Sequence, residues 1–184
     1  MNKNNLISVL EELSIGLRRF TVQHEHYSEQ WAEAFKLVSA EISPLLGDAQ
    51  VYHIGSTAIP GCIAKPILDI GIGYHQGADF AQQTQSLVEL GFTSKGAYGV
   101  EGRSFFTFYN DEETFDYIHI HAYKEQDPKL LAHIAFRDAH LADASLVEKY
   151  NELKIDLVSR GVSRQDYPAA KTAYITEVLD NPFA

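Results

Sequence analysis

The chain has 184 residues, of which 45% are hydrophobic and 22% charged, a composition that allows one hydrophobic core to close. Its 15 lysines and arginines against 25 aspartates and glutamates give a formal net charge of -10. This excess of acid disfavours duplex nucleic acid as a partner, but a local cluster of cations and amides can still bind a nucleotide or another phosphorylated small molecule.

The single cysteine, Cys62, excludes an intrachain disulfide and favours a reducing compartment. The first 20 residues lack the apolar core of a signal peptide, and no later run is long enough to span a membrane. We therefore expect one cytoplasmic domain over residues 1–184 with no membrane partner. The sequence leaves the oligomeric state unknown.

Two amphipathic helices are predicted at the start of the chain. Apolar residues recur at helical spacing from Leu6 to Leu17 and again from Trp31 to Ile42. Ser28 is expected to cap the second helix, and Pro44 and Gly47 are expected to mark its end.

The rest of the chain predicts a sheet followed by helices. The expected strands are 50–54, 67–72, 92–94, 104–109 and 115–123, and the expected helices are 78–90, 130–141, 146–158 and 169–179. This order indicates an α/β (α+β) fold, in which helices cover a mixed sheet whose second half is mostly antiparallel and the last third of the chain is helical.

The turn Gly55-Ser56-Thr57 directly follows the first of the central strands. Backbone N–H groups and two hydroxyls at a strand end can hold a phosphate, although a plain loop in which a hydroxyl caps a short helix fits the same residues. Lys65, at the end of the connection, either reaches that phosphate or simply precedes the next strand.

Asp69 lies inside the apolar run 67–72. A buried carboxylate without a partner is costly, so Asp69 is expected to have a cation or hydrogen-bond donors beside it. Mg²⁺ together with a phosphate is a natural partner, because Mg²⁺ binds one or two carboxylates along with substrate oxygens.

The run from His53 to Ile70, His-Ile-Gly-Ser-Thr-Ala-Ile-Pro-Gly-Cys-Ile-Ala-Lys-Pro-Ile-Leu-Asp-Ile, resembles the signature of the GrpB family, which is grouped with the nucleotidyltransferase-fold superfamily. The resemblance covers nearly the whole chain, and its further matches are residues 27–31, Phe35, 103–106, 119–121, 133–138, Tyr150, 153–154 and Lys171. It implies that the Gly-Ser turn holds nucleotide phosphates and that the next strand supplies acidic metal ligands.

The chain departs from the superfamily pattern at two acidic positions. Gly71 stands where the pattern has a second carboxylate two residues after Asp69. The strand expected to carry a third carboxylate contains His119 and His121 instead. The acidic triad is therefore incomplete, which puts a standard two-metal nucleotidyl transfer in doubt.

His119 and His121 alternate with isoleucines, so strand geometry directs both imidazoles to one face. With Asp69 they could share a cation, for which Zn²⁺, Mn²⁺ or Fe²⁺ suits two imidazoles better than Mg²⁺, and His53 is a possible fourth ligand. The alternative is that these histidines hydrogen-bond a phosphate or the backbone, or lie on a solvated face.

The helix predicted at 130–141 has a cationic stripe. Lys129, His133, Arg137 and His140 follow one another at spacings of four, four and three residues. A phosphate tail could lie against His133 and Arg137, although such a stripe is often only the solvated face of a helix.

Three functions fit these residues. The first is a nucleotidyltransferase-like enzyme, dependent on Mg²⁺ or Mn²⁺ (with Zn²⁺ possible), in which Asp69 and His119 or His121 are catalytic. The second is a non-catalytic nucleotide-binding or regulatory module that keeps the phosphate turn. The third is a metal-dependent phosphohydrolase built on the same histidines and aspartate.

Overall fold

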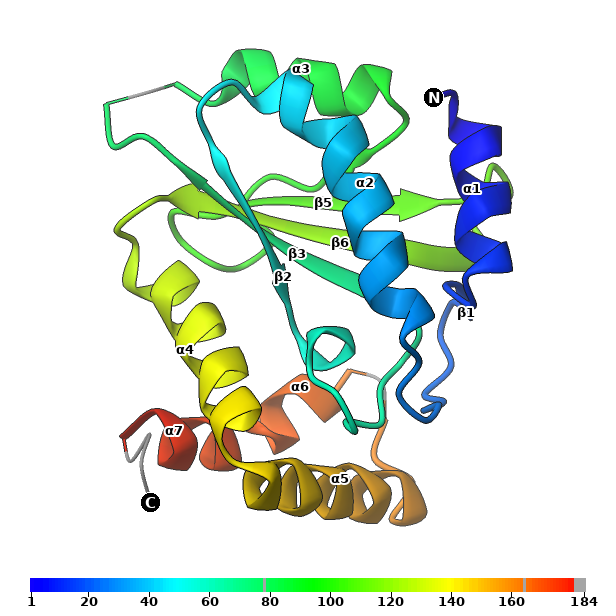
Figure 1. Ribbon diagram of the computed structural model, residues 1–184, viewed down its shortest axis with the longest axis vertical. Helices are drawn as coiled ribbons and strands as arrows, with labels where there is room; N and C mark the ends of the chain where they lie inside the picture. The colour runs from blue at the N-terminus through cyan, green and yellow to red at the C-terminus, as the bar shows by residue number, and fades with distance from the viewer. Residues whose placement is uncertain (78, 164, 181–184) are drawn as a thin grey trace.

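The computed structural model describes residues 1–77, 79–163 and 165–180 (Figure 1). The strands are β1 (Leu17–Arg18), β2 (Gln50–Ile54), β3 (Leu68–Tyr74), β4 (Thr93–Ser94), β5 (Ser104–Tyr109) and β6 (Phe115–Lys124). The helices are α1 (Lys3–Glu12), α2 (Gln30–Leu46), the 3₁₀ helix η1 (Ser56–Ala58), α3 (Ala81–Glu89), α4 (Pro128–Ala142), α5 (Ala144–Ser159), α6 (Tyr167–Ala170) and α7 (Thr172–Asp180).

The sheet is mixed, as predicted. Its strand order is β2-β3-β6-β5-β4, and β1 pairs with the start of β6. β3 and β6 run parallel, whereas the other pairs are antiparallel. The central pair of β3 and β6 carries the aspartate and the histidines singled out from the sequence.

The strand register divides the sheet into two faces. Asp69 is paired with His119 and Gly71 with His121, while Phe105 lies beside His121 on β5. Because neighbouring residues of a strand point to opposite faces, these side chains share one face and the intervening isoleucines share the other. We call them the polar face and the apolar face.

The apolar face packs against α1, α2 and α3 and forms the main core. Trp31, Val38 and Ile42 of α2 are fully buried against it. The strands contribute Leu68, Ile70, Ile72, Phe106, Phe108, Ile118, Ile120 and Ala122.

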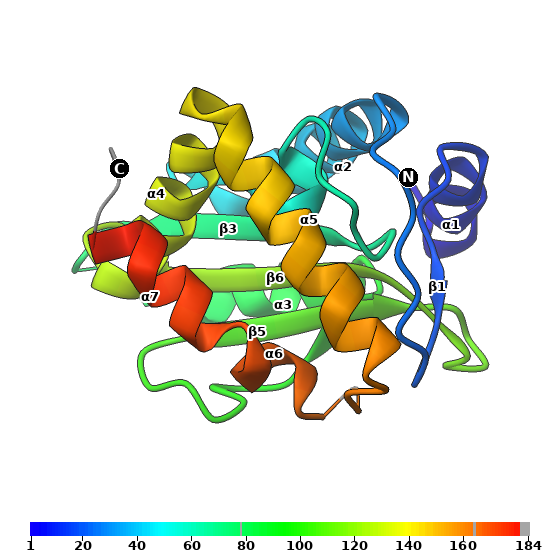
Figure 2. The same ribbon diagram turned by 90° about the horizontal axis from the view of Figure 1, so that it is seen from below.

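A second, smaller core holds the C-terminal helices together. Phe136 of α4, Val147 and Tyr150 of α5 and Val178 of α7 pack around Ile59, which follows η1. Figure 2 shows α5, α6 and α7 crossing in front of β3, β6 and β5, with α3 behind the strands. The helical last third therefore lies over the polar face.

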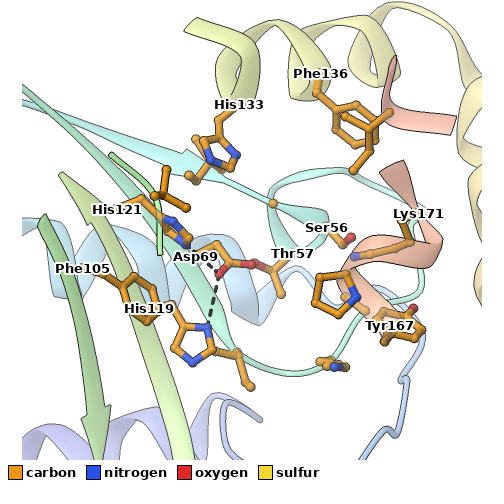
Figure 3. Close-up of a pocket in the computed structure, with 18 of the residues that line it drawn as sticks. Ser56, Thr57, Asp69, Phe105, His119, His121, His133, Phe136, Tyr167 and Lys171 are labelled. Carbon is orange, nitrogen blue, oxygen red and sulfur yellow. Dashed lines mark ion pairs between the residues drawn. The ribbon is translucent and has the colours of Figure 1, made fainter. Parts of the chain in front are cut away.

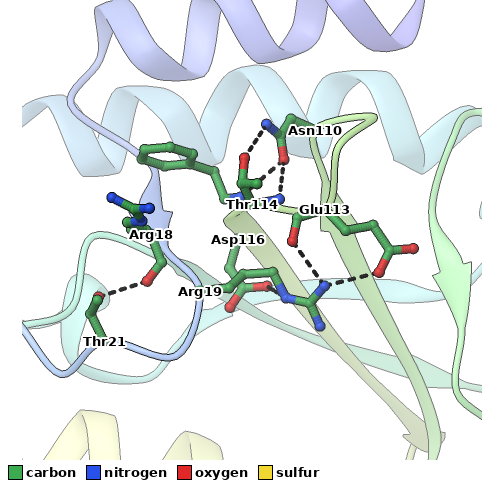
Figure 4. Close-up of polar contacts among 8 residues, drawn as sticks. Arg18, Arg19, Thr21, Asn110, Glu113, Thr114 and Asp116 are labelled. Carbon is green, nitrogen blue, oxygen red and sulfur yellow. Dashed lines mark hydrogen bonds and ion pairs between the residues drawn. The ribbon is translucent and has the colours of Figure 1, made fainter.

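The first predicted helix is shorter than its periodicity suggested. It ends at Glu12, because Ser14 (φ 58°) and Gly16 (φ 143°) adopt left-handed or extended positive-φ conformations, and Leu17 lies in β1. Arg19, just after β1, is held against the β5–β6 hairpin by Glu113 at 2.9 Å and Asp116 at 3.4 Å (Figure 4).

The structure confirms Gly47 as the end of α2, where it is the C-cap, but the expected roles of Pro44 and Ser28 were wrong. Pro44 lies inside the last turn of α2, because burial of Ile42 and Leu46 against the core outweighs the one helical hydrogen bond that Pro44 lacks. At the start, Glu29 takes the cap position, although Ser28 Oγ accepts a hydrogen bond from Gln30 N at 3.3 Å.

Two later helices also differ from the prediction. The helix expected at 169–179 is divided at Lys171 into α6 and α7. Ala78, the expected start of the helix before Gly91, lies outside the described residues, and α3 begins at Ala81. In the described part of the chain, no helix combines the length and apolar character needed to cross a membrane.

Candidate active site

A cavity of about 1010 Å³ lies between the polar face of the sheet and the C-terminal helices (Figure 3). Its walls come from η1, β3, β5, β6, α4, α5, α6 and α7. Gly55, Ser56, Thr57, Lys65, Asp69, His119, His121 and His133 all line it, so the fold brings together most of the residues predicted from the sequence.

The turn and the aspartate are in direct contact. Gly55 has a φ of 71°, and a Cβ atom on it would lie 2.5 Å from Asp69 Oδ2. Any side chain at this position would therefore displace the carboxylate as well as strain the backbone. Behind the turn, Thr57 Oγ1 lies 3.0 Å from His53 Nε2, so the imidazole of His53 fixes the start of η1.

Two imidazoles meet the carboxylate of Asp69. His119 Nδ1 lies 3.5 Å and His121 Nε2 3.6 Å from Asp69 Oδ1. Burial acts to raise the pKa of the Asp69 carboxyl, but hydrogen bonding and charge interaction with both imidazoles outweigh it and hold that pKa well below its usual range. Asp69 is therefore an anion at neutral pH.

The histidines deeper in the cavity are kept neutral. Burial lowers the pKa of His121 despite the nearby Asp69 carboxylate. Burial and the neighbouring His121 ring, whose centroid is 5.2 Å away, lower the pKa of His133 to about 4. Neutral imidazoles keep one ring nitrogen as an acceptor or metal ligand.

The missing second carboxylate has a structural counterpart. A Cβ atom on Gly71 would lie 3.1 Å from Leu130 Cδ1 and 3.4 Å from Ile54 Cγ2. Leu130 of α4 is buried and fills the space into which a carboxylate at position 71 would project. The space for a carboxylate at position 71 is thus occupied by the Leu130 side chain.

One end of the cavity is rich in cations, and we call it the lysine end. Lys171 Nζ lies 4.8 Å from the centroid of the Tyr167 ring, and Lys65 Nζ lies 4.6 Å from the same ring. Lys154 is 2% exposed and donates to Cys62 Sγ at 2.9 Å and to the carbonyl of Ile63.

Burial lowers the pKa of Lys154 to about 8 and also lowers the pKa of Lys171. Burial raises the pKa of Tyr150, whose hydroxyl shares a hydrogen bond with Ser56. A bound anion would stabilise the desolvated ammonium groups beside the turn, because it replaces the interactions with water that burial has removed.

The charge of the cavity is opposite to that of the whole chain. Seven of the 15 lysines and arginines line it, against two of the 25 aspartates and glutamates. Within the described residues, Lys95, Arg103, Lys129, Lys154 and Lys171 have no carboxylate at ion-pair distance. The cavity therefore favours an anionic ligand.

Three of the predicted residues have other surroundings. The His53 ring stacks on Phe35 with centroids 4.6 Å apart, away from the cavity lining. Arg137 Nη1 donates to the carbonyl of His53 at 2.8 Å, and its Nη2 pairs with Asp138 at 2.7 Å. His140, expected on the cationic stripe, is buried against Phe136.

Several lining residues were absent from the predicted site: His24, Arg103, Tyr150, Lys154, Tyr167 and Lys171. They come from loops and helices far from the turn in sequence, and a lysine in an amphipathic helix is indistinguishable from one on its solvated face. The resemblance to the GrpB family at Arg103, Tyr150, Lys154 and Lys171 was the one signal that marked part of this set.

A metal ion would find an incomplete set of ligands. Asp69, His119 and His121 supply the donor types that a single transition metal takes, one carboxylate and two imidazole nitrogens. With Leu130 packed over Gly71, the residues do not fit a pair of ions bridged by two carboxylates. Among the described residues, no group of three or more ligand side chains forms a ready metal cage.

The fold is that of the nucleotidyltransferases. A crystal structure of Cid1 poly(U) polymerase with Mg 3'-dATP bound matches with a TM-score of 0.50 and 14% identity, over 79% of this chain and 44% of that chain.

Within this fold, the chain can be assigned to a narrower family. The model of the GrpB protein family matches residues 21–181, and the chain belongs to this family. The crystal structure of the conserved protein GrpB from Enterococcus faecalis matches with a TM-score of 0.77 and 23% identity, over 87% of this chain and 96% of that chain. The UPF0157 protein YqkA of Bacillus subtilis is 32% identical over 158 residues, which are 84% of this chain and 45% of YqkA. This chain thus spans less than half of that relative.

Proposed function

We propose that the cavity binds a nucleoside triphosphate and transfers its nucleotidyl group to an acceptor. The polyphosphate would lie against Ser56, Thr57 and the lysine end, with the α-phosphate beside Asp69. The observation that carries this proposal is the concentration of seven lysines and arginines around one cavity of an acidic protein, next to a turn that carries two hydroxyls.

The proposed transfer exchanges one phosphorus–oxygen bond for another. A hydroxyl oxygen of the acceptor forms a bond to the α-phosphorus, the bond from that phosphorus to the β-phosphate oxygen breaks, and pyrophosphate leaves towards Lys154 and Lys171. The hydroxyl proton passes to solvent. The two lysines would stabilise the charge that develops on the leaving group.

A single divalent ion, if bound, would be held by Asp69 with His119 or His121 and would supply Lewis-acid stabilisation of phosphate oxygens. The chain's own contribution is to keep Asp69 ionised and the imidazole of His121 neutral. Gly55 lets the turn approach Asp69 closely, so that the turn and the carboxylate can reach the same phosphate group.

A second candidate function, nucleotide binding without turnover, is favoured by Leu130. Because Leu130 occupies the space above Gly71, the site lacks a position at which a second metal-bridging carboxylate would fit. Such a protein would bind the triphosphate through the same turn and lysine end and would release no pyrophosphate.

Titration calorimetry with ATP and with inorganic triphosphate tests the binding step. We expect Lys171→Met to weaken both ligands about 10-fold or more, because one charge-assisted contact contributes roughly 1.5–3 kcal/mol. Lys149→Met is the matched control, since Lys149 is an exposed lysine of α5 outside the cavity. Equal affinities of the wild type and Lys171→Met would rule out the lysine end as the phosphate site.

A pyrophosphate-release assay with ATP, Mn²⁺ or Mg²⁺ and a mixture of acceptors then separates the two functions. Release that is lost in Asp69→Asn supports transfer, whereas tight ATP binding without release supports the binding module. Release of inorganic phosphate would instead indicate a phosphohydrolase. Metal analysis of wild type, Asp69→Asn and His121→Ala tests the proposed ion, and equal metal content in all three would exclude it.

A further inference from the structure

The cavity has a second end, across the histidines from the lysine end. Figure 3 shows Phe105 and the two imidazoles on one side of Asp69, and Ser56 and Lys171 on the other. The centroid of the Phe105 ring lies 5.1 Å from that of His121 and 5.6 Å from that of His119. An aromatic surface therefore adjoins the imidazoles directly.

Tyr98 extends this surface towards solvent. Its ring stacks on Phe105 with centroids 5.3 Å apart and an interplanar angle of 19°, and yet Tyr98 is 68% exposed. One side of the Tyr98 ring thus contacts Phe105 while much of the residue remains open to solvent. We call the pair of Tyr98 and Phe105 the aromatic platform.

The loop that carries Tyr98 is held in place by Arg103. Arg103 Nη2 donates to the carbonyl of Tyr98 at 2.8 Å and Nε donates to the carbonyl of Ala97 at 3.2 Å. The Arg103 guanidinium also lies over the Phe105 ring, 4.6 Å from its centroid. Tyr98 has a φ of 45°, a conformation that costs free energy for a bulky residue and persists only where its surroundings impose it.

The platform lies among cations that have no carboxylate partner. Lys95 and Arg103 line the cavity here, and within the described residues neither has an acidic group at ion-pair distance. Lys95 Nζ lies 5.3 Å from the centroid of the Tyr109 ring. A ring that stacks on the platform would therefore be bound best if it also carried negative charge.

The geometry of the transfer decides which ligand this end receives. In a phosphoryl displacement the attacking and leaving oxygens lie roughly in line on opposite sides of the phosphorus. If pyrophosphate leaves towards the lysine end, the acceptor must approach from the side of the histidines and the platform. The in-line geometry does not require the base of the triphosphate to lie at the platform.

We infer that the aromatic platform is the acceptor site, and that it takes a nucleoside monophosphate or a similar ligand in which an aromatic ring carries a phosphate. The ring stacks on Tyr98 beside Phe105, and the phosphate is neutralised by Lys95 and Arg103. This assignment rests on the proposed function for its orientation, because the lysine end defines where the leaving group goes.

Calorimetry on the full chain tests the assignment with the four nucleoside 5'-monophosphates as probes, titrated into protein already saturated with inorganic triphosphate. The wild type is expected to bind at least one of them. Tyr98→Ala should weaken that binding by roughly 5- to 100-fold, the effect of removing one stacking partner. Tyr98→Phe, which keeps the ring, should retain the wild-type affinity.

The affinity for inorganic triphosphate, which has no ring, should be the same in the wild type, Tyr98→Ala and a Phe115→Ala control, an exposed aromatic outside the cavity lining. Unchanged monophosphate affinity in Tyr98→Ala, or no monophosphate binding to the wild type, would overturn the acceptor site. Equal losses for ATP and the monophosphate would also overturn it, since the platform would then hold the base of the triphosphate. Failure of the wild type to bind inorganic triphosphate would instead count against the proposed function.

Discussion

Neighbouring residues of the same strands have different roles on the two faces of the sheet. Ile70 and Ile120 are fully buried against α1, α2 and α3, whereas Asp69 and His121 keep partial access to the cavity. The apolar face is filled by packed side chains and the polar face encloses about 1010 Å³ of open space. Stability and ligand binding are therefore separable in this chain at the level of single residues.

The largest difference between the two faces is expected when adjacent residues of β6 are truncated. Ile120→Ala should lower the free energy of unfolding by about 2–5 kcal/mol, because it leaves a void in a packed core. His121→Ala should cost about 1 kcal/mol or less, since it only enlarges a cavity that already exists. Urea unfolding measures both, and calorimetry with ATP should show the larger loss for His121→Ala. Equal destabilisation by the two variants would contradict the division of the faces.

A second carboxylate on β3, placed at position 71, tests whether the Leu130 side chain excludes an acidic residue from this position. Gly71→Asp should destabilise by about 1–3 kcal/mol, because its Cβ meets Leu130. In a Leu130→Ala background the same change should cost less, and the difference is the coupling energy of a double-mutant cycle. Gly71→Ala separates the steric effect from the charge. Additive effects in the cycle would show that Leu130 does not exclude the carboxylate.

The buried ammonium of Lys154 should make the stability of the polar side depend on pH. Its pKa is about 8 in the folded chain, against an unfolded value near 10.5. The unfolded state therefore binds more protons between these values, and the free energy of unfolding should rise by about 2 kcal/mol between pH 8 and about 9.5. Lys154→Met should remove most of this rise. Polyphosphate affinity should fall over the same range as the cation is lost.

The smallest expected effects come from two matched helix caps. Asp127 accepts from Lys129 N at the start of α4, and Asp143 accepts from Ser145 N at the start of α5, both at 2.8 Å. Asp127→Ala and Asp143→Ala should each cost about 0.5–2 kcal/mol. Both changes should also weaken ATP binding, because α4 carries His133 and α5 carries Lys154 over the cavity. Unchanged ATP affinity in both variants would show that these caps do not position the cavity walls.

The sheet was predictable because its two-residue periodicity is explicit in the sequence. Alternation of His119 and His121 with isoleucines was enough to place both imidazoles on one face, and the register then put them beside Asp69. Gly47 was correctly expected at the end of α2, whereas the expectation for Pro44 was wrong, because the tendency of proline to end a helix is outweighed by the burial of the residues around it.

The lysine end could not be derived from local patterns. Lys154 lies in an amphipathic helix and looks like a surface residue until α5 folds over the turn and buries it. Arg137 shows the converse, since its position on the predicted stripe suggested a phosphate ligand while its guanidinium bonds to the backbone of β2 and to Asp138. Both outcomes depend on contacts between segments far apart in the sequence.

The contact between Gly55 and Asp69 has a practical consequence for protein engineering. Because the carboxylate occupies the space where a side chain at position 55 would be, the turn and the acid form one indivisible module. A designer who transplants this site to another scaffold must carry β2, the turn and β3 together, with their spacing intact. Conversely, a library that randomises position 55 should return glycine alone among variants that retain the native site.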